Sequence, residues 1–145
     1  DGFMKLALYS ELARGDIVKA REVISAENFE SSLEGIHLFR ERLIDGRYPQ
    51  IKSLHHWSDF YTTSMCRDLC FHIQEHRYTV NQIEKLIKSF ELKFLGFILD
   101  QNTKEQYALK FNTDQHQTNL KNWALFENIH RDTFKAMYQF WVQHY

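Results

Sequence analysis

Three short segments of the chain carry apolar residues with the spacing of β-strands, and the longer stretches between them carry the spacing of helices. Residues 3–9 are apolar on both faces except at Lys5, which is typical of a strand covered on both sides. Residues 92–99 leave no room for a helical period, and residues 137–143 are rich in aromatic and β-branched side chains. The sequence therefore predicts strands at 3–9, 92–99 and 137–143, although the spacing of the last segment also allows a helix.

Capping patterns mark the start of several helices. Ser31 with Glu34, and Thr79 with Gln82, form two capping boxes, each in front of apolar residues at helical spacing. Further helices are predicted to begin near Asp16, within residues 53–71, at Thr103, and at Thr118 or Asn119. Three short strands cannot bury so many amphipathic helices. Either the helices form a bundle of their own, or further strands lie upstream.

The chain enters an apolar segment directly after Asp1 and Gly2, so we expect a piece of a longer protein. Its 18 Lys and Arg residues against 19 Asp and Glu residues give a formal net charge of −1. Domains that bind nucleic acid carry a basic surplus, so no nucleic-acid partner is expected. No segment approaches the roughly 18 apolar residues of a membrane span, and two cysteines cannot form a disulfide scaffold. We therefore expect no membrane partner and a cytoplasmic location.

Four motifs are distinctive in combination. They are Tyr9-Ser10-Glu11-Leu12-Ala13-Arg14, Cys66-Arg67-Asp68-Leu69, Phe71-His72-Ile73-Gln74-Glu75-His76-Arg77 and Tyr138-Gln139-Phe140-Trp141. Together with the three strand-like segments, they resemble the C-terminal half of a class I S-adenosylmethionine-dependent methyltransferase, of the bacterial type often fused to tetratricopeptide repeats. The resemblance covers essentially all 145 residues and implies a single domain over 1–145 that includes substrate-lid helices.

The resemblance also implies a fold. It is an α/β fragment, α+β as it stands, with a Rossmann-like, three-stranded mixed sheet in the order 3–9, 137–143, 92–99. The strand at 137–143 runs antiparallel in the middle of this sheet, so Tyr138, Phe140 and Trp141 are expected in the core. The outer edge of strand 3–9 is left free, and a free apolar edge invites pairing. We expect a second copy of the chain (a homo-oligomer), a rearranged helix or the missing N-terminal half to cover it.

The elements that grip the methyl donor in this family are missing from the sequence. Glycine occurs only at positions 2, 15, 35, 46 and 96, which excludes the Gly-rich turn after the first strand. The resemblance thus implies S-adenosylmethionine as cofactor in the intact enzyme and none for this chain alone. The implied function is the substrate-lid and sheet-closing part of a methyltransferase acting on an unknown acceptor. The alternative is a helical protein-interaction or dimerisation module, which predicts a helix at 137–143.

Candidate site residues lie in the motifs. His72 or His76 is proposed to act as the base, oriented by Glu75 or Asp68, because a histidine beside a carboxylate accepts protons near neutral pH. The residues expected to bind substrate are Tyr9, Ser10, Glu11, Arg67 and Asp68. Two structural interpretations stay open: an Arg67–Glu75 or Asp68–Arg77 ion pair that ties the lid together, and Ser10 as a helix cap.

A metal site is the other possible use of the central motif. Cys66, Cys70, His72 and His76 are spaced C-x3-C-x-H-x3-H, which is not a known zinc-finger spacing. In a continuous helix His72 would also lie on a different face from Cys66. We therefore expect no metal, and we interpret the two cysteines as small apolar core residues.

Overall fold

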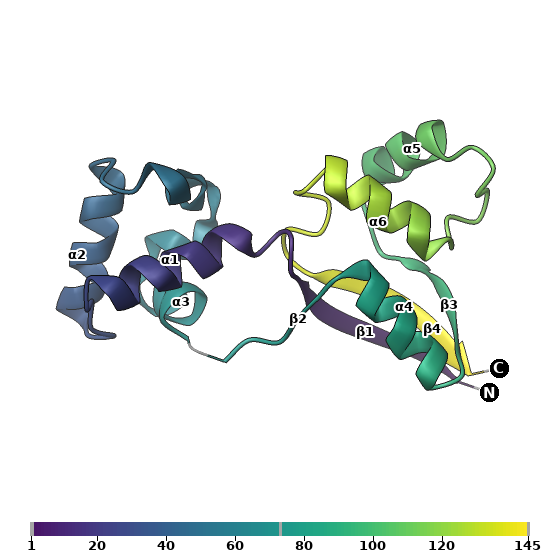
Figure 1. Ribbon diagram of the computed structural model, residues 1–145, viewed down its shortest axis with the longest axis horizontal. Coiled ribbons are helices and arrows are strands. Elements are labelled where there is room, and N and C mark those ends of the chain that lie inside the picture. Colours follow the sequence, from purple (N-terminus) through teal and green to yellow (C-terminus); the bar gives the residue numbers. More distant parts are fainter. Residues whose placement is uncertain (1, 73, 145) are drawn as a thin grey trace. The chain divides into compact units, whose positions relative to one another are not determined.

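The computed structural model describes residues 2–72 and 74–144, which belong to two compact units (Figure 1). Unit 1 consists of the chain up to Ala13 and from His76 onward, and unit 2 spans Arg14–Glu75. Each unit has its own cluster of buried apolar side chains. The protein is thus α+β, and the helices of unit 2 form a core of their own. The single domain over 1–145, in which the two units would unfold together, stays a prediction.

Unit 1 contains a four-stranded mixed sheet in the order β2-β1-β4-β3 (Figure 1). The strands are β1 (Phe3–Ser10), β2 (Arg77–Tyr78), β3 (Leu92–Phe97) and β4 (Tyr138–His144). Strand β4 runs antiparallel to both neighbours, and Phe140 lies opposite Leu6 on one side and Phe97 on the other. The predicted order of strands 3–9, 137–143 and 92–99 is therefore confirmed, and the alternative of a helix at 137–143 is wrong.

The predicted count of three strands is wrong, because β2 adds a fourth. It pairs in parallel with the end of β1, where Tyr9 lies opposite Arg77 and Ser10 opposite Tyr78. Two residues are too few to show a strand period in the sequence, so this strand is defined by its pairing alone. It covers only the carboxyl end of the edge expected to be free. Within the described residues, no strand lies along this edge at residues 3–8.

One face of the sheet is buried against helices α4 (Val80–Ser89), α5 (Gln101–Lys110) and α6 (Leu120–Ile129). The side chains of Tyr138, Phe140 and Val142 alternate along β4, and all three are fully buried. The Phe97 ring of β3 lies 4.6 Å from the ring of Phe134 and 5.5 Å from that of Trp123, measured between centroids. This aromatic cluster gives unit 1 its core.

The opposite face of the sheet is open to solvent. Lys5 lies opposite Trp141, and Phe3 lies opposite Gln143, so these four side chains share that face. Phe3 is 67% exposed and Trp141 is 41% exposed. The expectations that Trp141 is core and that residues 3–9 are covered on both sides are wrong. The alternation of buried and polar positions along β4 is instead that of a sheet with one buried face.

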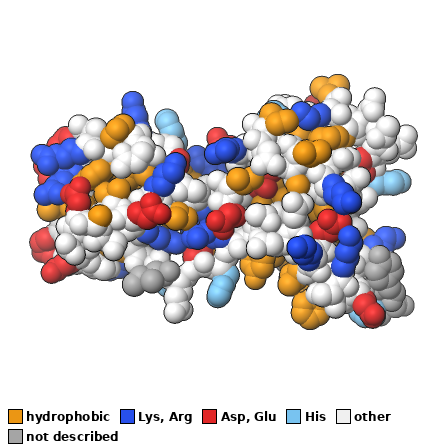
Figure 2. Space-filling view, viewed as in Figure 1, with side chains coloured by type: hydrophobic (Ala, Val, Ile, Leu, Met, Phe, Trp, Pro, Cys, Tyr) orange, Lys and Arg blue, Asp and Glu red, His pale blue; other side chains and the backbone are white. Residues whose placement is uncertain are grey.

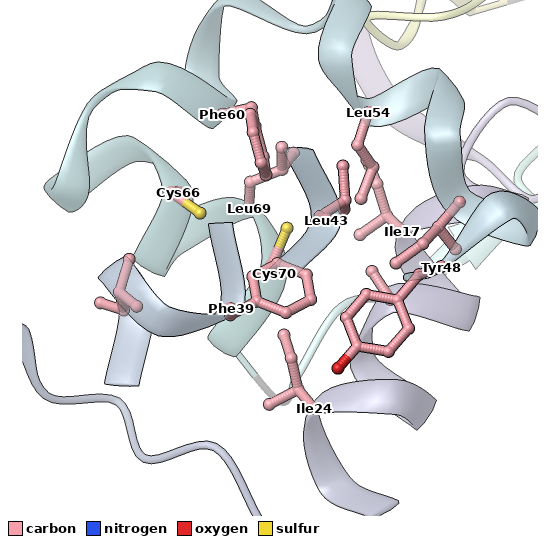
Figure 3. Packing of buried hydrophobic residues seen from close by; sticks show 13 residues of the cluster. Ile17, Ile24, Phe39, Leu43, Tyr48, Leu54, Phe60, Cys66, Leu69 and Cys70 are labelled. Atoms are coloured by element: carbon pink, nitrogen blue, oxygen red, sulfur yellow. The ribbon is translucent and has the colours of Figure 1, made fainter. Parts of the chain in front are cut away.

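In the described part of unit 2, all the regular elements are helices. They are α1 (Gly15–Ala26), α2 (Leu33–Ile44), η1 (Pro49–His56), η2 (Ser58–Tyr61), α3 (Thr63–Cys66) and the π-helical turn η3 (Arg67–Phe71). Phe39 of α2 lies at the centre of their core (Figure 3). Its ring centroid is 5.6 Å from that of Phe29, 5.8 Å from that of Phe71 and 6.5 Å from that of Phe60.

The helical spacing predicted over 53–71 is divided among several short helices. Trp57 and Thr62 interrupt it, because both have extended backbone angles (ψ of 122° and 146°). The Thr62 side chain accepts a hydrogen bond from the Met65 amide at 3.3 Å and thereby caps α3. Apolar periodicity located this core segment but did not show where its backbone turns.

The predicted helix starts are largely correct. The Thr79 capping box of α4 is confirmed, and Asn119 caps α6. In α2 the cap is Ser32 rather than Ser31, and in α5 it is Asp100, three residues before Thr103. Each of these caps accepts a hydrogen bond from an amide of the first helical turn.

Charged side chains of both signs lie on the face shown in Figure 2. On this face, Lys and Arg side chains alternate with Asp and Glu side chains. In the part of the chain that the structure describes, no helix is long and apolar enough to cross a membrane.

Gly35 offers a direct test of the unit 2 packing. A Cβ at this position in the first turn of α2 would lie 2.2 Å from the carbonyl oxygen of Glu30, so the backbone would have to move. We expect Gly35→Ala to lower the free energy of unfolding, measured in urea, by about 1–3 kcal/mol. The matched control is Gly15→Ala in α1, where an added Cβ meets no atom within 4 Å. Equal stability of the two variants would contradict this packing.

Candidate functional site

A buried carboxyl group lies at the carboxyl end of β1. Ser10 ends β1, and its hydroxyl donates to Oε1 of Glu127 on α6 at 2.5 Å. Tyr138 begins β4, and its hydroxyl donates to both carboxyl oxygens of Glu127, at 2.8 and 2.7 Å. Glu127 is 1% exposed, and Ser10 and Tyr138 are fully buried. This Glu127 cluster therefore joins two strands and a helix through one carboxyl group.

The Glu127 cluster retains its protons strongly. Burial raises the pKa of Glu127, and the hydrogen bonds from Ser10 and Tyr138 lower it only in part. Burial also raises the pKa of Tyr138, and the neighbouring Glu127 charge raises it further. Because these partners are hydroxyl groups, the Glu127 carboxyl group stays protonated to a higher pH than an exposed glutamate. The cluster can hold a proton and fix the end of β1, but it presents no group to solvent.

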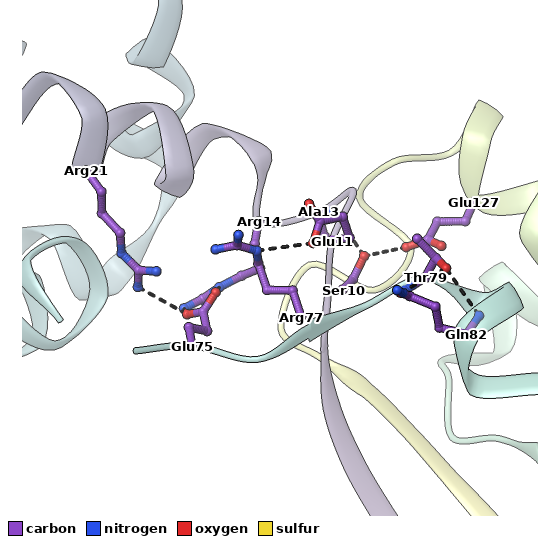
Figure 4. Close-up of polar contacts among 10 residues, drawn as sticks. All are labelled: Ser10, Glu11, Ala13, Arg14, Arg21, Glu75, Arg77, Thr79, Gln82 and Glu127. Atoms are coloured by element: carbon purple, nitrogen blue, oxygen red, sulfur yellow. Dashed lines mark hydrogen bonds and ion pairs between the residues drawn. The ribbon is translucent and has the colours of Figure 1, made fainter. Parts of the chain in front are cut away.

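The structure brings the predicted residues Tyr9, Ser10 and Glu11 together at the end of β1, as expected, but it encloses Ser10. Tyr9 is half-buried and, one residue from Ser10 along the strand, points to the opposite face. The half-exposed carboxylate of Glu11 accepts a hydrogen bond from Nε of Arg77 at 3.3 Å (Figure 4). Ser10 also accepts a hydrogen bond from the Ala13 amide at 3.0 Å, so it caps the turn after β1 rather than helix α1.

In unit 2, the predicted catalytic residue Glu75 lies in a buried cluster with two arginines (Figure 4). Arg14 donates from Nε to Oε1 at 3.2 Å and from Nη2 to Oε2 at 2.5 Å. Arg21 donates from Nη2 to Oε2 at 3.2 Å. Burial alone would raise the pKa of Glu75, but the hydrogen bonds and charges of Arg14 and Arg21 outweigh it and lower that pKa. Glu75 in this Glu75 cluster is therefore an ionised carboxylate. It forms ion pairs with Arg21 of α1 and with Arg14, the residue before α1.

The other candidate residues are exposed. His72 has Nδ1 3.0 Å from the carbonyl oxygen of Gln74. A carbonyl oxygen only accepts, so Nδ1 carries the proton of the neutral ring and Nε2 keeps the lone pair that can accept another. Arg67 and Asp68 lie exposed on η3 in unit 2, whereas His76 is exposed in unit 1. Their catalytic and substrate-binding roles stay predictions.

The two cysteines are free thiols in the core of unit 2 (Figure 3). A hydrogen bond with Cys66, together with burial, raises the pKa of Cys70, and the same hydrogen bond lowers the pKa of Cys66. His72, by contrast, is exposed. No group of three metal-ligating side chains is found among residues 2–72 and 74–144.

Sequence reasoning missed the polar contacts of four residues at these clusters. Glu127 carried a usable signal, because it follows Leu120 and Trp123 on the apolar face of α6, at a position where a buried side chain is expected. Arg14 and Arg21 carried none, since their partner Glu75 is more than fifty positions away in the sequence. Tyr138 was expected in the core, and its hydroxyl bond to Glu127 could not be foreseen.

Comparison with known proteins adds no family. A scan against protein-family models finds no match, and a search of curated proteins finds none either. The methyltransferase resemblance therefore rests on the residues of the chain itself.

Glu127→Gln tests the Glu127 cluster, because it removes the titrating group and keeps the side-chain shape. A raised pKa means that the folded state binds more protons than the unfolded state above about pH 4.3, the usual glutamate value. The stabilisation that this group contributes is therefore lost as the pH rises through its folded pKa. We expect the stability of the wild type relative to Glu127→Gln to fall as the pH rises above about 4.3, by about 1.4 kcal/mol for each pH unit until the folded-state pKa is passed.

Urea unfolding of both proteins across this pH range measures the effect. Glu105→Gln on α5 is the matched control, because the carboxylate of Glu105 is exposed. Its difference from the wild type should stay constant with pH. A constant difference for Glu127→Gln as well would refute the protonated cluster.

Proposed function

We propose that this chain is the sheet-closing and substrate-lid part of a class I S-adenosylmethionine-dependent methyltransferase. The observation that carries the proposal is the position of β4, which lies antiparallel between β1 and β3. In the family that the chain resembles, the fifth, seventh and sixth strands have this order, with the seventh antiparallel. The motifs at residues 9–14, 66–77 and 138–141 supply the second line of support.

Donor binding is assigned to a different part of the intact enzyme. The chain has no Gly-rich turn for a nucleoside cofactor. The edge of β1 at residues 3–8 has no strand beside it among the described residues, and an open edge is a template for another strand. We place the N-terminal half of the enzyme along this edge, although a second copy of the chain would pair with the same atoms.

The chemistry is a displacement at the sulfonium. The acceptor oxygen or nitrogen attacks the methyl carbon, the carbon–sulfur bond breaks, its electron pair stays on sulfur, and the acceptor loses a proton. Nε2 of His72 is available to take that proton, because Nδ1 is engaged by the Gln74 carbonyl. His76 is the second candidate base, and Arg67 and Asp68 are proposed to position the acceptor from η3. Glu75 is proposed to act indirectly, because its ion pairs with Arg14 and Arg21 hold helix α1 in place.

A partner-binding role without catalysis is the second candidate. The open face of the sheet favours it, since Phe3, Ile98 and Trp141 are each at least 40% exposed and line one hollow with Leu95. Scattered apolar residues are normal on a surface, whereas contiguous ones mark interaction sites. The helical form of this alternative is already wrong, because residues 138–144 are a strand.

The proposal predicts an apolar strand followed by a Gly-rich turn about a hundred residues upstream in the gene. The polypeptide from that strand through residue 145 should bind S-adenosylhomocysteine in calorimetric titration, and the chain alone should give no heat. In that polypeptide, His72→Ala should lower turnover by about 10²–10⁴ with an unchanged circular dichroism spectrum.

His116→Ala is the control for the loss of an exposed histidine outside the motifs, and it should keep full turnover. A longer polypeptide that binds no S-adenosylhomocysteine would refute the proposed function. Unchanged turnover of His72→Ala would remove only His72 from the mechanism.

A further inference from the structure

Unit 2 contains a cleft of about 670 Å³ between the end of α1, residues 28–31 and the end of η3. Residues that line it include Arg21, Ser25, Asn28, Phe29, Phe71 and His72. This volume falls in the range of sites for small organic molecules. Of the residues of this Arg21 cleft, His72 also has a role in the proposed methyl transfer.

Arg21 is incompletely satisfied in the wall of the cleft. Its Nη2 donates to the Leu69 carbonyl oxygen at 2.9 Å and to Glu75 at 3.2 Å. Its Nε is buried and has no hydrogen-bond partner among the described residues. Because Nε has almost no accessible surface, a ligand in the cleft would meet other atoms of the Arg21 side chain.

The charge around Arg21 favours an anion. The Glu75 carboxylate is already held through both oxygens by Arg14, so Arg21 is a second cation beside a carboxylate that has its partner. Among the described residues that line the cleft, Glu30 is the only acidic one, and it is exposed. A negatively charged ligand group beside Arg21 would balance the second guanidinium.

The rest of the lining combines apolar and polar side chains. Ile24 and Cys70 are buried there, and the rings of Phe29 and Phe71 are half-buried. Ser25, Asn28 and His72 are exposed polar residues of the same cleft. Such a lining fits a ligand that has an apolar body and one polar head.

We propose that the Arg21 cleft binds a small amphiphilic carboxylate, with the carboxylate at Arg21 and the apolar body against Phe29 and Phe71. This binding site goes beyond the proposed methyl transfer and does not depend on it. Bare phosphate would satisfy the arginine but leave the apolar lining exposed, and a neutral aromatic compound would leave the second guanidinium without a counter-charge.

The full chain can be titrated with naphthylacetate, with its neutral analogue naphthylacetamide and with inorganic phosphate, using calorimetry. We expect naphthylacetate to bind at least about tenfold more tightly than either of the others. Equal Kd values for the acid and the amide would overturn the anion site. No binding of the acid at millimolar concentration would overturn the cleft as a carboxylate site altogether.

Two matched variants locate the site. Ser25→Phe puts a bulky side chain at an exposed position of the cleft, whereas Ala26→Phe puts the same side chain on the next residue of α1, which does not line it. We expect Ser25→Phe to weaken naphthylacetate binding by at least about tenfold and Ala26→Phe to leave it unchanged. Wild-type affinity in Ser25→Phe would overturn the location.

Arg21→Gln tests the charge directly. It should abolish the preference for the acid over the amide while the amide binds as before. A preference that persists in Arg21→Gln would assign the anion to another group. If this variant fails to fold, the comparison of acid and amide on the wild-type chain still decides the question.

Discussion

Unit 1 depends on strand β4 being paired along both of its edges. β4 lies at the end of the chain, and its neighbours β1 and β3 begin about ninety positions apart, so no local contact holds them in one sheet. The buried side chains of Tyr138, Phe140 and Val142 then give helices α4 and α6 a common surface to pack on. Removing β4 would leave β3 without a paired strand and β1 paired only with β2 at its carboxyl end, and the aromatic core would lose the side chains of Tyr138, Phe140 and Val142.

Two buried carboxyl groups support the units in opposite ways. Glu127 is bonded to hydroxyl groups, and its pKa is raised, so its contribution to stability is greatest at low pH and is lost as the pH rises. Glu75 is bonded to arginines, and its pKa is lowered. Its contribution is present above the unfolded pKa and is lost as the pH falls through the folded one. The chemistry of the partners, rather than burial itself, decides which form each carboxyl group adopts.

The sequence predicts elements with strong local signals and misses those that distant contacts create. The apolar runs at 3–9 and 92–99 and the Thr79 capping box were located from spacing alone, and the strand order came from the family resemblance. Strand β2 was missed because two residues carry no period. Trp141 was placed in the core, since nothing in the sequence tells that one face of the sheet is open. The two arginines that pair with Glu75 could not be predicted either, because these ion pairs join residues far apart in the chain.

The placement of Tyr9, Ser10 and Glu11, and with it the methyltransferase proposal, depends on β4 lying between β1 and β3. Nuclear Overhauser contacts in the solution spectrum of the chain test this most directly. The account predicts contacts from Phe140 to both Leu6 and Phe97, with extended-strand coupling constants over residues 138–144. Helical sequential contacts over these residues, or contacts from Phe140 to neither strand, would contradict it.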